Sequence, residues 1–218
     1  YDLDMDEEIS IINSNSRNDK IKNFIFDNKN KIISSIIIIL IVIVGFYSFD
    51  KYKINKKKKI SEDFNLATIE YSENLKDETI SRLIDIINEK DPTYSPLSLY
   101  FIIDNKLILD QDQINSFFDI LINKTVLDNE IKNLVIYKKA LYNADQSSEG
   151  DLLSTLNPLI NSKSVWKSHA LYLMAEYFYA KEQNQKAKEF FNQIISSENP
   201  NPDIRLQAEK RLKRDFSE

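Results

Sequence analysis

Residues 32–49 form a mainly apolar run that contains no charged side chain and lies between Lys31 and Asp50. As an α-helix this run would be roughly 27 Å long, close to the thickness of the hydrocarbon core of a lipid bilayer. Its many Ile and Val residues also suit a β-strand, but a lone strand in lipid would leave its backbone groups unpaired, whereas a helix pairs them internally. We therefore predict a transmembrane anchor at Ile32–Phe49; the alternative is a wholly buried core helix.

The residues that flank this run support a membrane anchor that is retained in the mature protein. Aromatic side chains, which favour the membrane–water interface, lie at both ends of it: Phe24, Phe26, Phe46, Tyr47, Phe49 and Tyr52. The apolar run is longer than the core of a usual signal peptide, and no Ala-x-Ala-like pattern of small residues follows it. We therefore expect the segment to stay attached to the rest of the chain.

The composition divides the chain into four segments around this anchor. Its 218 residues include no Cys, only 2 Gly and 5 Pro, and have a formal charge of −5, which fits one anchor and one modest domain without disulfides or thiolate chemistry. Residues 1–31 are polar and form a tail that we predict to be mostly disordered. Residues 50–60 are a basic stalk, and residues 61–218 form the remaining domain. Lys56–Lys59 in the stalk suit anionic lipid headgroups, although a solvated stalk explains them equally well.

The charges on either side of the anchor leave its orientation open. Lys and Arg are enriched on the cytoplasmic side of single-pass anchors within about 20 residues of the membrane. Five precede the anchor, at Arg17, Lys20, Lys22, Lys29 and Lys31, and six follow it, at Lys51, Lys53, Lys56, Lys57, Lys58 and Lys59. The nearly equal counts favour a cytoplasmic C-terminal domain only slightly.

Residues 61–218 show helical periodicity almost throughout and no long alternation of the strand type, so we predict an all-α domain. Ser61, followed by Glu62 and Asp63, is the expected N-cap of the first helix, and Asp112 is the expected cap of the fourth. The further helices are expected at residues 77–90, 95–107, 128–144, 152–160, 164–181, 185–197 and 203–216, with a turn at 147–150. In the helix at 128–144 the residues expected to face inward are Ile131, Leu134, Val135, Leu141 and Ala144.

Helix pairs that recur about every 34 residues are typical of a tetratricopeptide-like array, a solenoid of antiparallel helix pairs. The clearest unit begins at Ser168, and its expected packing positions are Leu171, Met174, Ala175, Phe178, Ala187, Phe191 and Ile194. One unit earlier the corresponding residues of the first helix are Tyr137, Ala140, Leu141 and Ala144. The alternative is an irregular helical bundle.

Several segments resemble a known family. These are the aromatic and basic exit from the anchor at Tyr47–Lys59 and the segments Ser61–Ala67, Ser164–Ala170, Ala187–Phe191 and Asn199–Arg205. With the short polar N-terminal tail and single anchor, they are similar to the membrane-anchored tetratricopeptide-like proteins of Gram-negative bacteria. That family is typified by the ancillary subunit of the Sec translocon, here in its alphaproteobacterial branch. The resemblance implies an inner-membrane protein with a cytoplasmic tail and a periplasmic helical domain that acts beside the translocon and periplasmic chaperones.

Residues suited to catalysis are scarce. His169 is the only histidine and there is no Cys, so neither a histidine-based metal site nor a Cys–His pair is available. Asp110 and Asp112 have a spacing seen in metal sites, but a loop and a helix cap explain them fully. We therefore expect no enzyme activity, no metal, no cofactor and no small-molecule substrate, and the acidic balance argues against nucleic acid.

Binding of proteins is the function that the sequence favours. The first helices of stacked pairs line a concave surface, and on the frame set by Ser168 the residues predicted to line it for a partner are Lys138, Tyr142, His169, Tyr172, Glu176 and Tyr179. Tyrosines beside charges suit protein recognition; the alternative is that Tyr172 and Tyr179 pack against the preceding helix pair. Two functions follow: an interaction module beside the secretion machinery, or a structural or self-associating envelope scaffold.

Overall fold

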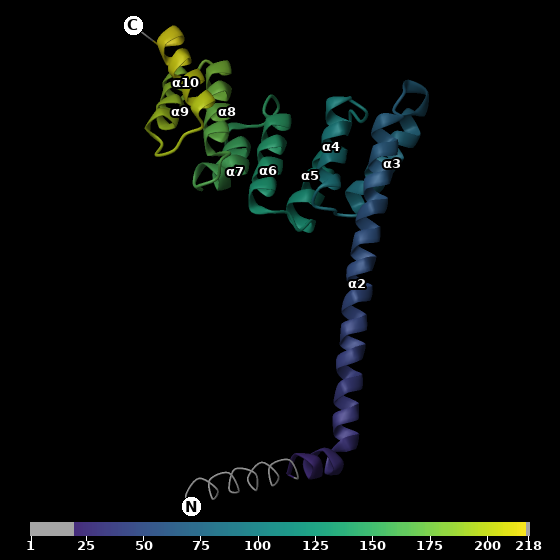
Figure 1. Ribbon diagram of the computed structural model, residues 1–218. Helices are drawn as coiled ribbons and strands as arrows, with labels where there is room; N and C mark the ends of the chain where they lie inside the picture. The colour runs from purple at the N-terminus through teal and green to yellow at the C-terminus, as the bar shows by residue number, and fades with distance from the viewer. Residues whose placement is uncertain (1–19, 217–218) are drawn as a thin grey trace, which may run out of the picture. The chain divides into compact units, whose positions relative to one another are not determined.

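The computed structural model describes residues 20–216, without the side chains of Ile32 and Glu73, and it is helical with no strand in that range. Residues 20–27 are helical and precede the element that contains the apolar run. The elements that follow are α2 (Lys29–Ile69), η1 (Glu73–Leu75), α3 (Lys76–Asn88), α4 (Tyr94–Asp104), α5 (Gln111–Lys124), α6 (Asn129–Asn143), α7 (Glu149–Ile160), α8 (Lys167–Ala180), α9 (Asn184–Ser196) and α10 (Pro202–Asp215) (Figure 1). The prediction of an all-α protein is confirmed.

The apolar run lies inside α2, a single helix of 41 residues. Of the helices in residues 20–216, α2 alone is long and apolar enough to cross a membrane, and none of its most apolar stretch is buried inside the molecule. The structure forms two compact units, one ending at Lys58 and one beginning at Lys59. The helix α2 continues without a break past the end of the first unit.

Two expectations around the anchor differ from the structure. Ser61 is not an N-cap, because α2 passes straight through the predicted stalk; no Gly or Pro occurs between residues 46 and 91 to end a helix there. The Ser61 hydroxyl instead accepts a hydrogen bond from the Tyr94 hydroxyl at 2.7 Å. In the predicted disordered tail, residues 20–27 and 29–31 are helical, and this stretch also lacks Gly and Pro. Residues 1–19 of that tail lie outside the described residues.

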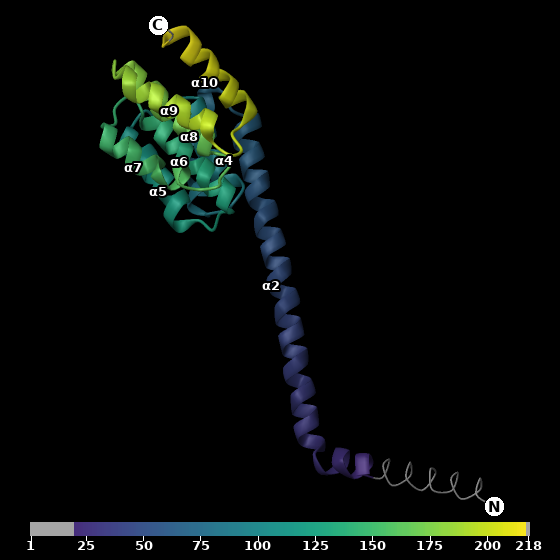
Figure 2. The same cartoon turned by 90° about the vertical axis from the view of Figure 1, so that its left-hand side faces the viewer.

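The helices of the second unit recur at regular intervals along the chain. The first residues of α3, α5, α7 and α9 are 35, 38 and 35 residues apart, and the first residues of α4, α6, α8 and α10 have the same three spacings. Each of these helices packs against the next in the chain, and α8 also packs against α6 and α10. Figure 2 shows α5 and α7 in one layer with α4, α6 and α8 in a second layer.

Side-chain caps set the beginnings of four helices, and these caps differ from the two predicted ones, Ser61 and Asp112. The side chains of Asp110, Asp128, Ser148 and Asn201 accept backbone N–H groups at the starts of α5, α6, α7 and α10. Asp110 rather than Asp112 therefore caps the fourth predicted helix. The predicted turn at residues 147–150 is shorter than expected, because the Ser148 cap allows α7 to begin at Glu149.

The core consists of two clusters that share α6. Val135 of α6 belongs to the cluster formed with the end of α2 and with α3, α4 and α5, whereas Ala140 belongs to the cluster formed with α7 to α10. Because α6 packs on both sides, its inward positions differ from the predicted stripe. Ile131 and Leu141 were expected to face inward, but they are 41% and 46% exposed. The predicted packing positions of α8 and α9, from Leu171 to Ile194, are all buried.

Candidate functional site

The six residues predicted to bind a partner lie in three different surroundings along α6 and α8. Lys138 and Tyr142 of α6 lie beside α4 and α5. His169 lies at the start of α8, and Tyr172, Glu176 and Tyr179 lie further along α8, beside α10. The structure therefore brings together only these last three residues, and α10 supplies the other half of their surroundings.

An ion pair joins Glu176 to α10. The Arg211 guanidinium donates from Nε to Oε1 of Glu176 at 2.7 Å and from Nη2 to Oε2 at 2.6 Å, a bidentate geometry that is among the stronger polar contacts in proteins. The hydrogen bonds that Arg211 donates to Glu176 raise the pKa of the guanidinium, which therefore stays charged. The same guanidinium contacts Asp215 and lies 4.2 Å from the centre of the Tyr179 ring.

The two tyrosines of this site are partly buried against aromatic neighbours. The Tyr172 ring lies 5.5 Å from Phe191 of α9, and the Tyr179 ring lies 5.8 Å from Phe216, just after α10. Both distances fit edge-to-face aromatic pairs. The described contacts are thus with elements that follow α8 rather than with the preceding helix pair. Burial raises the pKa of the Tyr172 hydroxyl, with a further contribution from Glu176, so this hydroxyl stays protonated and can donate.

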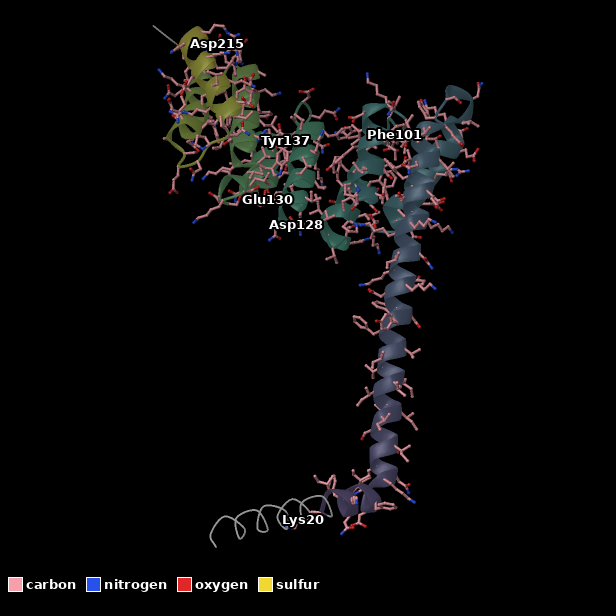
Figure 3. All side chains as sticks on the ribbon, viewed as in Figure 1. Lys20, Phe101, Asp128, Glu130, Tyr137 and Asp215 are labelled. Atoms are coloured by element: carbon pink, nitrogen blue, oxygen red, sulfur yellow. The ribbon has the colours of Figure 1, made fainter. Side chains whose placement is uncertain are left out.

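A groove of about 540 Å³ opens beside this site between α8 and α10. Tyr172 lines it together with five side chains of α10, which are Gln207, Lys210, Arg211, Lys213 and Arg214. Sequence reasoning missed the α10 residues, although the four cationic side chains within residues 210–214 were a visible signal. Asp215, labelled in Figure 3, accepts hydrogen bonds from Arg214 beside the groove, and these lower the pKa of Asp215.

His169 belongs to an aromatic cluster at the junction of α6 and α8. Its ring centre lies 5.0 Å from Trp166 and 5.7 Å from Tyr137, and Tyr137 stacks on Trp166 at 5.7 Å. The Nδ1 atom of His169 is buried and has no hydrogen-bond partner in the described structure, and burial lowers the pKa of the imidazole. Trp166 is thus a packing residue between helices.

The same junction is closed by a polar contact. The Ser164 hydroxyl donates to Oε2 of Glu130 at 2.7 Å and accepts the Trp166 backbone N–H at 3.1 Å. Figure 3 labels Glu130 and Tyr137, which both belong to α6. The contacts fix the loop before α8 and orient the aromatic cluster rather than present a reactive group.

Lys138 and Tyr142, the two residues of α6 that were predicted to bind a partner, contact aromatic side chains of α4 and α5. The Lys138 ammonium lies 5.3 Å from the centre of the Tyr100 ring, and Tyr142 packs 6.1 Å from Phe118. The Tyr100 hydroxyl is buried without a partner among residues 20–216, and burial raises its pKa. These contacts tie α6 to α4 and α5.

The part of the chain that the structure describes contains no set of metal ligands. Within residues 20–216 no three or more His, Cys, Asp or Glu side chains lie close enough together to hold a metal ion.

A second cavity, of about 390 Å³, lies among α7, α8 and α9 and is lined mainly by amide, hydroxyl and charged groups.

No protein-family model matches the chain, and neither a curated protein nor a solved structure is significantly similar to it.

Proposed function

We propose that this protein is a non-catalytic interaction module anchored in a bacterial inner membrane. In this proposal Ile32–Phe49 spans the membrane, the N-terminal tail is cytoplasmic, and a tetratricopeptide-like helical domain in the periplasm binds proteins beside the Sec translocon and periplasmic chaperones.

The regular spacing of the helices carries the proposal. Two interleaved series of helices with identical spacings of 35, 38 and 35 residues fit a solenoid of helix pairs better than an irregular bundle. Burial of the seven packing positions in α8 and α9 supports the frame that begins at Ser168. The exposed Leu141 fits the frame less well, so the unit that begins in α6 is a divergent one.

Hydrogen bonds between neighbouring elements repeat with nearly the same period. They join Ser61 to Tyr94, Glu130 to Ser164, Ser168 to Asn201 and Glu176 to Arg211, at separations of 33, 34, 33 and 35 residues. Two of these contacts start from equivalent positions, since Glu130 and Ser168 are each the second residue of their helix, α6 and α8. These contacts support stacked units in which α6, α8 and α10 share one layer.

A second candidate is a structural or self-associating envelope scaffold. The observation that favours it is the engagement of Glu176 and Tyr179 by Arg211, which leaves less of the predicted partner face free. In this case the array spaces or joins copies of the chain rather than binding translocon subunits.

Site-specific crosslinking distinguishes the two candidates. A photo-crosslinking amino acid replaces Gln207, which is exposed in the groove, in the full chain in bacterial membranes; the matched control replaces Asn192, which is exposed on α9. We expect translocon subunits or periplasmic chaperones to be crosslinked from position 207 and not from position 192. Crosslinks only to further copies of the chain would favour the scaffold.

A further inference from the structure

We propose that the groove between α8 and α10 binds an acidic peptide segment of a partner protein. The inference rests on the proposed function and adds to it the chemical class of the ligand. The occupant is an extended segment whose Asp or Glu side chains meet the cationic side of α10 and whose backbone contacts Gln207 and Tyr172.

The charge of the groove is opposite to that of the domain around it. Residues 59–218 contain 19 Lys or Arg and 26 Asp or Glu, a formal charge of −7. Four cationic side chains nevertheless line the groove; Glu176 and Asp215 pair with two of them, Arg211 and Arg214. A local reversal of sign inside an acidic surface attracts an acidic ligand and directs it to this one place.

Arg211 holds α10 against α8 at the groove rather than binding the ligand. Its guanidinium is held by both oxygens of Glu176 and by Asp215, and it lies against the Tyr179 ring. The remaining cations are more accessible. Lys210 is exposed, and the Arg214 side chain is 68% exposed although it contacts Asp215. These two side chains supply the charge that a ligand carboxylate meets.

The neutral groups in the groove favour a peptide over a small anion or a lipid surface. Gln207 carries both an N–H donor and a carbonyl acceptor, the pair that matches a peptide bond. The aliphatic stems of Lys and Arg provide apolar contact beside their charges. The volume of about 540 Å³ lies within the range of ligand sites.

Fluorescence anisotropy on the full chain in neutral-lipid nanodiscs tests the inference. The probe is a labelled peptide of about ten residues, half of them Glu, and its control has Gln at the same positions. We expect the Glu peptide to bind the wild type and the Gln peptide to bind at least about tenfold more weakly. Lys210→Glu should weaken binding of the Glu peptide by about tenfold, whereas the matched charge change Lys188→Glu, exposed on α9, should leave it within about twofold.

Three results would overturn the inference. Equal binding of the two peptides would show that charge does not select the ligand. Equal effects of Lys210→Glu and Lys188→Glu would show that the peptide responds to overall charge and not to the groove. Capture by phosphatidylglycerol vesicles that depends on Lys210, without peptide binding, would identify a lipid surface. Crosslinking from position 207 is measured separately, so retained partner capture with no acidic-peptide binding refutes this inference and leaves the proposed function standing.

Discussion

At the scale of single residues, the ends of α4 and α8 are closed by residues in an uncommon conformation. Glu182 has φ of 58°, and its N–H donates to Tyr179 while the next N–H, of Gln183, donates to Phe178 at 2.9 Å. Lys106, with φ of 51°, closes α4 in the same way. This arrangement usually has Gly at the left-handed position, because a Cβ atom there is strained. The chain, which has only 2 Gly, uses charged residues instead.

Replacing Glu182 by Gly should therefore stabilise the protein. Glycine relieves the backbone strain of the folded state, and this gain exceeds the entropic cost of a more flexible unfolded chain. We therefore expect the free energy of unfolding to increase by about 0.5–1 kcal/mol. The control Lys188→Gly, in the exposed interior of α9, should lose about 1 kcal/mol. Thermal unfolding in detergent measures both variants. A lower melting temperature for Glu182→Gly would contradict the described closure of α8.

The second prediction at this scale concerns pH. Burial lowers the pKa of His169 below 6.5, so below that pH the unfolded chain binds a proton that the folded chain resists. Stability from this residue is complete above pH 6.5 and decreases as the pH falls below it. Because His169 is the only histidine, His169→Gln should remove most of the change in melting temperature between about pH 7.5 and about pH 5.5. An unchanged pH profile in the variant would contradict this assignment.

At the scale of elements, α10 is held differently from α8 and α9. Ala208 is its one fully buried residue, and much of its remaining attachment comes from Arg211 and from partly buried apolar side chains. The helix thus combines a shallow apolar contact with a strong polar one. This explains how a mainly charged helix closes the described part of the domain and still presents a cationic groove.

The close contact of α8 and α9 gives a prediction for that helix pair. Ala187 is fully buried, so Ala187→Leu adds volume to a packed crossing and should cost about 1–3 kcal/mol of unfolding free energy. Ala180→Leu, the same change at an exposed position at the end of α8, should cost less. The melting temperatures of the two variants check this. Equal values for wild type and Ala187→Leu would contradict the packing and the repeat frame.

At the scale of the whole molecule, the orientation of the proposed anchor decides where the domain functions. The proposed function requires the residues after the anchor to be periplasmic, although the nearly equal flanking charges do not select that orientation. External protease added to spheroplasts should therefore digest the C-terminal domain without lysis. Protection of the domain, with digestion of an N-terminal tag, would contradict both the topology and the translocon proposal.

The sequence alone determined the properties that depend on neighbouring residues. The uncharged run at residues 32–49, the helical periodicity after it and the beginning of a helix near residue 128 are local patterns, because a helix is made of contacts three and four residues apart. Even there, the unbroken α2 shows that a cap-like Ser61 cannot begin a helix where nothing ends the preceding one.

The tertiary structure alone decided which faces of the helices are covered. Ile131 and Leu141 have the periodicity of core residues, yet α6 turns Val135 and Ala140 toward its two clusters and leaves the other two exposed. The bond between Glu176 and Arg211 likewise joins residues 35 positions apart. Such contacts depend on how whole helices pack, and the local pattern of one helix contains no information about the side chains of the next.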